Sequence, residues 1–477
     1  MSRLATEFER YDGLGLAELI RNKEVTADEV LAATLERVEA RNPAVNAVTL
    51  RMDEQARAAI RAGLPDGPLK GVPYFLKDLG VLYAGTVTSF GSRLYSGYVA
   101  DHDSEIVARM KRAGLVIAGK TNTPEMGIAP STEPRLFGPT RNPWKPTHSA
   151  GGSSGGAAAA VASGMLPMAH ATDGGGSIRI PASACGLFGL KPTRARNPAG
   201  PDAGEGWSGA SIGHAVTWTV RDSAALLDAT SGPDVGDPYW APPPARPFLE
   251  EVGRDPGRLR IALTVKPWVE GPVDPEVAEA TREAGKLCAS LGHHVEEARP
   301  EIDEAAWQQS TLVIVTASLT FALETRAAAL KRPLGQDDIE RITWERVQLA
   351  KSFGAADYAR AIHTVHRTGR AVARFLERYD VLITPTMAKP PHPLGVLDLS
   401  NPDTAAFNAA RNASIGFTSL FNSSGHPAMS VPLAMSRDGL PLGIQFAARF
   451  GDEATLFRLA AQLEAARPWK DRRPRLG

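Results

Sequence analysis

The stretch T-D-G-G-G-S-I-R-I-P at residues 172–181 constrains this chain most, because three consecutive glycines precede a single serine. Glycine loses more conformational freedom on folding than any other residue, so such a run needs a reason. Without side chains, Gly174, Gly175 and Gly176 allow successive backbone N–H groups to turn toward one point, as an oxyanion hole requires. Ser177 would then lie beside the carbonyl group held there. The alternative interpretation is a flexible surface turn.

Three charged residues lie in positions that need an explanation: two flank the glycine run, and one lies in an apolar segment. Asp173 and Arg179 flank the glycines, and we expect them to hold the loop rather than to do chemistry. Lys77 lies in G-V-P-Y-F-L-K-D-L-G, an apolar setting that is unusual for lysine because burial of an ammonium group is costly. Desolvation lowers a lysine pKa and produces a usable base near neutral pH. The alternative, a structural pair with the neighbouring Asp78 at a strand end, is favoured when this segment is considered alone.

A second glycine-rich segment, G-G-S-S-G-G at residues 151–156, comes directly before an Ala-rich run that predicts a helix. It fits either a flexible linker or a glycine loop at a helix N-terminus, although the Lys of a Walker loop is missing. It also matches G-x-S-x-G, with Ser153 at its centre. That nucleophile elbow needs a strand directly before the serine, and R-N-P-W-K-P-T-H-S-A is a poor strand, so the elbow is disfavoured.

Histidine, the usual base for a catalytic serine, occurs ten times, but no pattern marks one as a triad member. His363 and His366 share a predicted helix face without an acidic residue at metalloprotease spacing, so we expect no metal there. His293 and His294 lie where a helix gives way to a strand, and we expect them to be solvated.

The order of predicted elements indicates an α/β fold. Thr26 and Glu29 fit a capping box, Gly114 ends a helix, and L-V-I-A-G-K follows as a buried strand. Residues 303–378 are mostly helical in pattern, and D-V-L-I-T-P is a second buried strand. This alternation favours helices packed on a sheet.

Charge and composition exclude some functions. Lys plus Arg (53) equals Asp plus Glu (53), so no basic field exists for nucleic acid or an anionic membrane. The two cysteines, Cys185 and Cys288, indicate a reducing compartment without disulfides. The uncharged stretch from Ser149 to Thr172 is rich in Gly, Ser and Ala, and predicts a core helix rather than a membrane span. The first residues are too charged for a signal peptide, so we expect a cytoplasmic protein.

Three of these segments together resemble the amidase signature family. G-V-P-x-x-x-K-D, G-G-S-S-G-G and D-x-G-G-S-I-R-I-P occur in the family's order and at its spacing, and the likeness weakens between about residues 235 and 375. The resemblance implies an α/β fold with a large twisted mixed β-sheet sandwiched between α-helices. It implies a single domain over residues 1–477, with its core at about 60–230 and 375–470. The variable region of about 235–375 would be mostly helical and would form the substrate pocket.

The resemblance also implies a Ser–cisSer–Lys triad without metal or cofactor. Ser177 would be the nucleophile, Ser153, preceded by a cis peptide, would relay the proton, and Lys77 would be the base. The backbone from Gly174 to Ser177 would form the oxyanion hole. The family often has Thr at position 174, and Gly there leaves the backbone role intact. All three triad positions are filled, which disfavours a non-catalytic binding module that keeps the fold.

Further segments, T-N-T-P-E-M-G, S-T-E-P and G-P-T-R-N-P-W, resemble family members that act on nylon oligomers. They imply an amidase for C–N bonds other than peptide bonds, whose partner is a small amide: apolar, aryl or 6-aminohexanoate-like, with carbamates or esters as further candidates. We predict substrate contacts at Met126 and Gly127, a homodimer, and an apolar substrate group against Trp307 to Leu323. The alternative is the glutaminase subunit of a tRNA-dependent amidotransferase.

Overall fold

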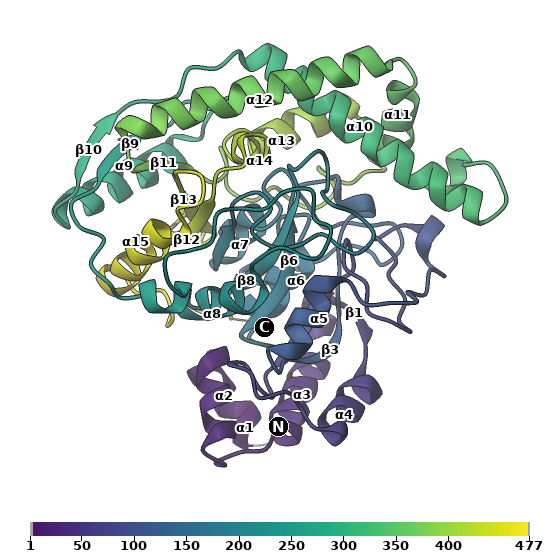
Figure 1. The fold of residues 1–477 in the computed structure, drawn as a ribbon, viewed down its shortest axis with the longest axis vertical. Helices are drawn as coiled ribbons and strands as arrows, with labels where there is room; N and C mark the ends of the chain where they lie inside the picture. Colours follow the sequence, from purple (N-terminus) through teal and green to yellow (C-terminus); the bar gives the residue numbers. More distant parts are fainter. Residues whose placement is uncertain (1–2, 476–477) are drawn as a thin grey trace.

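An eight-stranded mixed β-sheet forms the centre of the computed structural model, which describes residues 3–475 (Figure 1). The strand order is β10-β9-β11-β13-β12-β7-β8-β6. Neighbours among β10, β9 and β11 are parallel, and all later neighbours are antiparallel. The strands are β6 (Met168–Asp173), β7 (Phe188–Lys191), β8 (Ile212–Thr217), β9 (Arg260–Leu263), β10 (His294–Glu297), β11 (Val381–Pro385), β12 (Ala428–Met435) and β13 (Pro441–Ala448).

A smaller sheet extends this one, because its strand β2 packs beside β6. It has the order β1-β3-β2, with β2 parallel and β1 antiparallel to β3. A separate two-stranded sheet pairs β4 with β5. These strands are β1 (Val48–Arg51), β2 (Pro73–Lys77), β3 (Val116–Thr121), β4 (Arg141–Asn142) and β5 (Lys145–Ser149).

Helices cover both faces of the large sheet, because its strands are apolar on both sides. In β11, Val381 and Ile383 join the core cluster with α8, α9 and α15, whereas Leu382 joins a cluster on the opposite face with α10, α12 and α14. This arrangement confirms the predicted mixed sheet between helix layers. The helices on the sheet or near its edge are α6 (Gly155–Ala162), α7 (Arg179–Cys185), α8 (Val220–Thr230), α9 (Pro275–Ser290), α14 (Ser419–Ser424) and α15 (Glu453–Ala466).

Two groups of helices lie at opposite ends of the molecule in Figure 1, α1 to α4 (purple) and α10 to α12 (green). The capping box predicted at Thr26 and Glu29 is present at the start of α3. The helices of these two groups, together with α5 and α13, are α1 (Arg3–Glu7), α2 (Gly13–Arg21), α3 (Ala27–Val45), α4 (Asp53–Ala62), α5 (Glu105–Arg112), α10 (Glu304–Ala329), α11 (Arg341–Ala350), α12 (Ala355–Arg378) and α13 (Thr404–Ile415).

Two local predictions were wrong. The stretch from Ser149 to Thr172 is not one core helix but α6 followed by β6, because Gly164 (φ +68°) and Pro167 end the helix. His293 is buried rather than solvated. Its Nδ1 accepts the Leu259 N–H at 3.2 Å, and its Nε2 lies 2.8 Å from a Gln462 oxygen.

Among the described residues, one helix, α10, is long and apolar enough by length and composition to cross a membrane. It packs against α11 and α12, and its buried side chains, including Trp307 and Leu323, belong to the interior clusters of this fold. The core helix of a globular protein meets the same criterion of length and composition.

Candidate active site

The end of β2 brings Lys77 to Ser153. Lys77 Nζ lies 2.6 Å from Ser153 Oγ and 2.9 Å from Thr172 Oγ1, and the Lys77 side chain is fully buried. Burial lowers the pKa of Lys77 from 10.5 to about 7, and the negative charge of Asp173 opposes this shift. A large fraction of Lys77 is therefore neutral near pH 7 and can accept a proton.

Asp78, the alternative partner of Lys77, bonds elsewhere. Its carboxylate accepts hydrogen bonds from the backbone N–H (3.0 Å) and the hydroxyl of Ser89, and Lys120 Nζ lies 3.9 Å away. Across residues 3–475, Lys77 forms no ion pair with any carboxylate, so Lys77 and Asp78 are not a structural pair.

The loop that carries Ser153 contains the predicted cis peptide bond, between Gly152 and Ser153. A Cβ atom on Gly152 would lie 2.5 Å from the Ser131 backbone, which explains the glycine. The segment judged a poor strand does form β5, because it pairs with β4 in a hairpin, but β5 ends at Ser149, before this loop. Ser153 Oγ accepts a hydrogen bond from Lys77 and not from a histidine, so this is not a nucleophile elbow.

The three glycines before Ser177 have different surroundings. Gly176 adopts φ +130°, and a Cβ atom there would lie 2.4 Å from Thr418 Oγ1. A Cβ atom on Gly174 would lie 2.7 Å from the Trp207 ring. Gly175 faces open space, with nothing within 4 Å of such an atom. Close neighbours therefore exclude a side chain at Gly174 and Gly176, whereas Gly175 leaves the space beside it open.

Asp173 and Arg179 hold this loop, as predicted from their positions. Arg179 Nη2 donates to Asp173 Oδ1 at 2.8 Å and Nε donates to Oδ2 at 3.0 Å, and both side chains are fully buried. Asp173 also accepts the backbone N–H groups of Gly176 (2.7 Å) and Ile178 (3.0 Å). Burial alone would raise the pKa of Asp173, but the Arg179 guanidinium holds it well below its usual range.

This network corrects the predicted oxyanion hole in one position. The N–H of Gly176 points to Asp173 and not toward a substrate. In the described part of the chain, the N–H groups of Gly174, Gly175 and Ser177 have no hydrogen-bond acceptor. These three donors remain available for a carbonyl oxygen.

A small inner cavity of about 60 Å³ lies in front of Ser177. It is lined by Gly127, Gly152, Gly174 and Gly175 among others, so Gly127 is placed where the sequence predicted. Met126, its predicted companion, does not line this cavity. Its side chain is buried in a cluster of apolar residues that includes Leu319 and Leu323.

The predicted triad requires two hydrogen bonds, Lys77 to Ser153 and Ser153 to Ser177, and the structure contains the first of them. Within residues 3–475, the hydroxyl groups of Ser153 and Ser177 form no hydrogen bond with each other, although Lys77 and Ser153 do. In the same range, no group of three or more His, Cys, Asp or Glu side chains could hold a metal ion.

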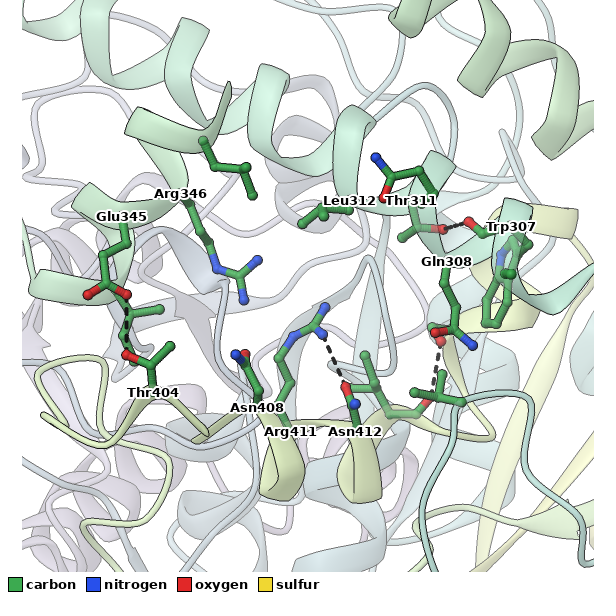
Figure 2. A pocket seen from close by; sticks show the side chains of 17 residues that line it. Trp307, Gln308, Thr311, Leu312, Glu345, Arg346, Thr404, Asn408, Arg411 and Asn412 are labelled. Carbon is green, nitrogen blue, oxygen red and sulfur yellow. Dashed lines mark hydrogen bonds between the residues drawn. The ribbon is translucent and has the colours of Figure 1, made fainter. Parts of the chain in front are cut away.

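The inner cavity shares Thr311, Arg346 and Arg411 with the lining of a larger cavity of about 640 Å³, shown in Figure 2. Helices α10, α11 and α13 line it. The sequence predicted a pocket from residues 235–375, which contain α10 and α11, but it missed α13. The polar residues of α13, at i, i+3 and i+4 spacing, were the available signal. They are Asn408, Arg411 and Asn412.

Comparison with known proteins places these features in context. The family model described as Amidase matches residues 29–457. A 6-aminohexanoate-cyclic-dimer hydrolase from Pseudomonas sp. (strain NK87) is 41% identical, over 98% of this chain and 96% of that protein.

Two solved structures bear on the fold. A 6-aminohexanoate cyclic dimer hydrolase aligns with a TM-score of 0.93 and 40% identity, over 98% of this chain and 99% of that chain. A glutamyl-tRNA(Gln) amidotransferase subunit from Thermotoga maritima aligns with a TM-score of 0.76 and 28% identity, over 97% of this chain and 96% of that chain.

Proposed function

The chain belongs to the amidase family and is an amide hydrolase, and from this premise we propose that it cleaves small amides through Ser177, Ser153 and Lys77. The buried 2.6 Å contact between Lys77 Nζ and Ser153 Oγ carries the proposal. Because its pKa is lowered to about 7, Lys77 supplies the base that histidine supplies in other serine hydrolases.

In the first half of the reaction, neutral Lys77 accepts the Ser153 proton while Ser153 accepts the proton of Ser177. Ser177 Oγ bonds to the amide carbon, and the carbonyl oxygen becomes an oxyanion stabilised by the N–H groups of Gly174, Gly175 and Ser177. When the C–N bond breaks, the proton held by Lys77 returns through Ser153 to the leaving nitrogen. The amine departs and an acyl-enzyme ester remains.

In the second half, water takes the place of the amine. The same relay removes a proton from water, whose oxygen attacks the ester carbon. The bond to Ser177 Oγ breaks, Ser177 regains its proton, and the carboxylic acid leaves. No metal or cofactor takes part in these steps.

The names of the relatives support an amide of the 6-aminohexanoate type as substrate. Aryl amides, carbamates and esters are further candidates, because an acyl-enzyme mechanism serves all of them. A glutaminase role resembling the amidotransferase protein has weaker support, because that protein is only 28% identical, against 41% for the cyclic-dimer hydrolase.

A substrate panel tests the proposal. Wild type, Ser177→Ala and the control Ser96→Ala, on the exposed surface, are each incubated with five kinds of substrate. The panel holds cyclic and linear 6-aminohexanoate oligomers, anilides, alkyl amides, a carbamate and glutamine, and mass spectrometry detects the products. We expect wild type and Ser96→Ala to cleave at least one of the non-glutamine amides and Ser177→Ala to cleave none. Cleavage of glutamine alone would favour the amidotransferase-like role, and full activity of Ser177→Ala would contradict the mechanism.

A further inference from the structure

Two arginines face each other across the larger cavity. Figure 2 shows Arg346, from α11, and Arg411, from α13, with their guanidinium groups directed toward one another. Both residues also line the inner cavity that contains Ser177. The two side chains therefore line both cavities, where they would meet a substrate that is bound at Ser177 and reaches the larger cavity.

Neither guanidinium has a carboxylate within ion-pair distance in the described part of the chain; burial lowers the pKa of Arg346, and the negative charge of Glu345 opposes this shift without pairing with it. Across residues 3–475, Arg346 and Arg411 form no ion pair, and Arg346 Nε has no hydrogen-bond partner. Arg411 Nη1 donates a 3.5 Å hydrogen bond to the Asn412 side-chain oxygen. Glu345, the carboxylate that lines the same cavity, is bound to Arg341 at 3.0 Å.

This arrangement is unfavourable without a ligand. Burial lowers the pKa of Arg411 to about 9, and the positive charge of Arg346 contributes to the shift. Two like charges, partly removed from water and without an ion-paired carboxylate, cost free energy that a bound anion would offset. A carboxylate suits two guanidinium groups best, because each can donate paired N–H groups to its oxygens.

We propose that Arg346 and Arg411 together bind a carboxylate of the substrate, so that the preferred substrates are amides that carry a free carboxylate. This inference rests on the proposed function, because it places the carboxylate relative to an amide bound at Ser177. A preference for carboxylate-bearing amides would distinguish this chain from the 6-aminohexanoate-cyclic-dimer hydrolase, whose name describes an uncharged substrate. A cyclic 6-aminohexanoate dimer has no charge, whereas the linear dimer ends in a carboxylate.

Two matched substrate pairs test the inference and locate the carboxylate. The leaving-amine arm compares linear 6-aminohexanoate dimer with N-(6-aminohexanoyl)hexylamine, in which a methyl group replaces the carboxylate. The acyl arm compares the mono-p-nitroanilide of adipic acid, whose second carboxylate is free, with the p-nitroanilide of hexanoic acid, which has a methyl group at that place. In wild type, we expect kcat/KM to be about 10- to 100-fold higher for the carboxylate member of one arm, the range expected for a charge-assisted hydrogen-bonded contact.

Variants assign this preference to the two arginines. Arg346→Gln and Arg411→Gln should each lower the ratio of kcat/KM values at least about tenfold, and Arg411→Lys should lower it less, because the charge remains. The control Arg360→Gln removes an exposed arginine of α12 that pairs with Asp357, and should keep the wild-type ratio.

An inhibition measurement on wild type tests the inference even if the arginine variants fail to fold. Adipate should inhibit hydrolysis of the hexanoyl anilide competitively, and hexanamide should inhibit it at least tenfold more weakly. Equal kcat/KM values in both arms, equal inhibition, or an unchanged ratio in both Gln variants would overturn the inference while leaving amide hydrolysis intact. Absence of hydrolysis of every amide would instead contradict the proposed function.

Discussion

Lys77 Nζ and Ser153 Oγ lie 2.6 Å apart, with both side chains buried. The amine comes from the end of β2 and the hydroxyl from the loop before α6, so the fold joins two distant segments at one point. His170, the histidine bound to the Lys77 backbone N–H at 3.3 Å, is a poor base, because burial lowers its pKa to about 3. Lys77 is thus the group beside this serine whose pKa suits proton transfer near neutral pH.

The rate should follow the titration of Lys77. Because burial lowers its pKa to about 7, kcat/KM should rise roughly tenfold per pH unit below 7 and level off above it. The sign follows from chemistry: a protonated amine cannot accept the Ser153 proton. Rates measured from pH 5 to 10 on an uncharged amide check this, with circular dichroism as the control for folding. A flat profile, or a rise that continues to the ordinary lysine value of 10.5, would contradict the role of Lys77.

Ser153→Ala should remove the relay while leaving the fold intact. Lys77 keeps its contact with Thr172 in this variant, so we expect little loss of stability and a fall in kcat of about 10²- to 10⁴-fold, the range for general acid–base catalysis. Ser163→Ala, which loses a buried hydroxyl at the end of α6, is the matched control and should keep most of the activity. Ser153→Ala with more than a tenth of wild-type kcat would argue against a relay.

Gly176→Ala should destabilise the protein, and Gly175→Ala should not. Alanine at Gly176 must adopt φ +130° and meet Thr418 Oγ1 at 2.4 Å, which costs roughly 1–3 kcal/mol. At Gly175 a Cβ atom has nothing within 4 Å, so the free energy of unfolding should stay near the wild-type value. Urea unfolding of both variants measures the difference, and equal midpoints would show that the loop tolerates side chains at both positions.

Asp173→Asn should destabilise the fold strongly, because it leaves the Arg179 charge buried and unpaired, at a cost of about 3–5 kcal/mol. The Arg179 guanidinium holds the pKa of Asp173 below its usual 3.8, so the stability this carboxylate contributes is complete above that pH and is lost in acid. Thermal unfolding at pH 7 and pH 3 tests both statements. Glu283→Gln, in an exposed ion pair with Lys286, should leave Tm unchanged at pH 7.

Local sequence was enough for features that depend on neighbouring residues. The apolar run before Lys77 predicted a buried lysine, and the side chain is fully buried. Asp173 and Arg179 were expected to hold the glycine loop, and they form a buried ion pair across it. The helix and strand order predicted helices packed on a sheet, because periodicity and turn residues act over short distances. The mixed sheet between helix layers was implied by the family resemblance.

Features that depend on long-range packing were beyond local patterns. Arg346 and Arg411 come from separate helices, and only the folded chain shows that both face one cavity (Figure 2). The apolar pattern of Trp307 to Leu323 predicted an apolar substrate group, whereas α11 and α13 add these charges to the cavity. The N–H of Gly176 was expected to face the substrate, but the Asp173 side chain accepts it. Met126 belongs to an apolar cluster that also contains Leu319 and Phe407, which come from distant segments.

Covalent labelling of Ser177 tests the central claim most directly. Wild type and Ser177→Ala are treated with a fluorophosphonate, digested, and mapped by mass spectrometry. The mechanism predicts one adduct, on the peptide that contains Ser177, and none in Ser177→Ala. An adduct on Ser153, or equal labelling of Ser177→Ala, would show that Ser177 is not the nucleophile.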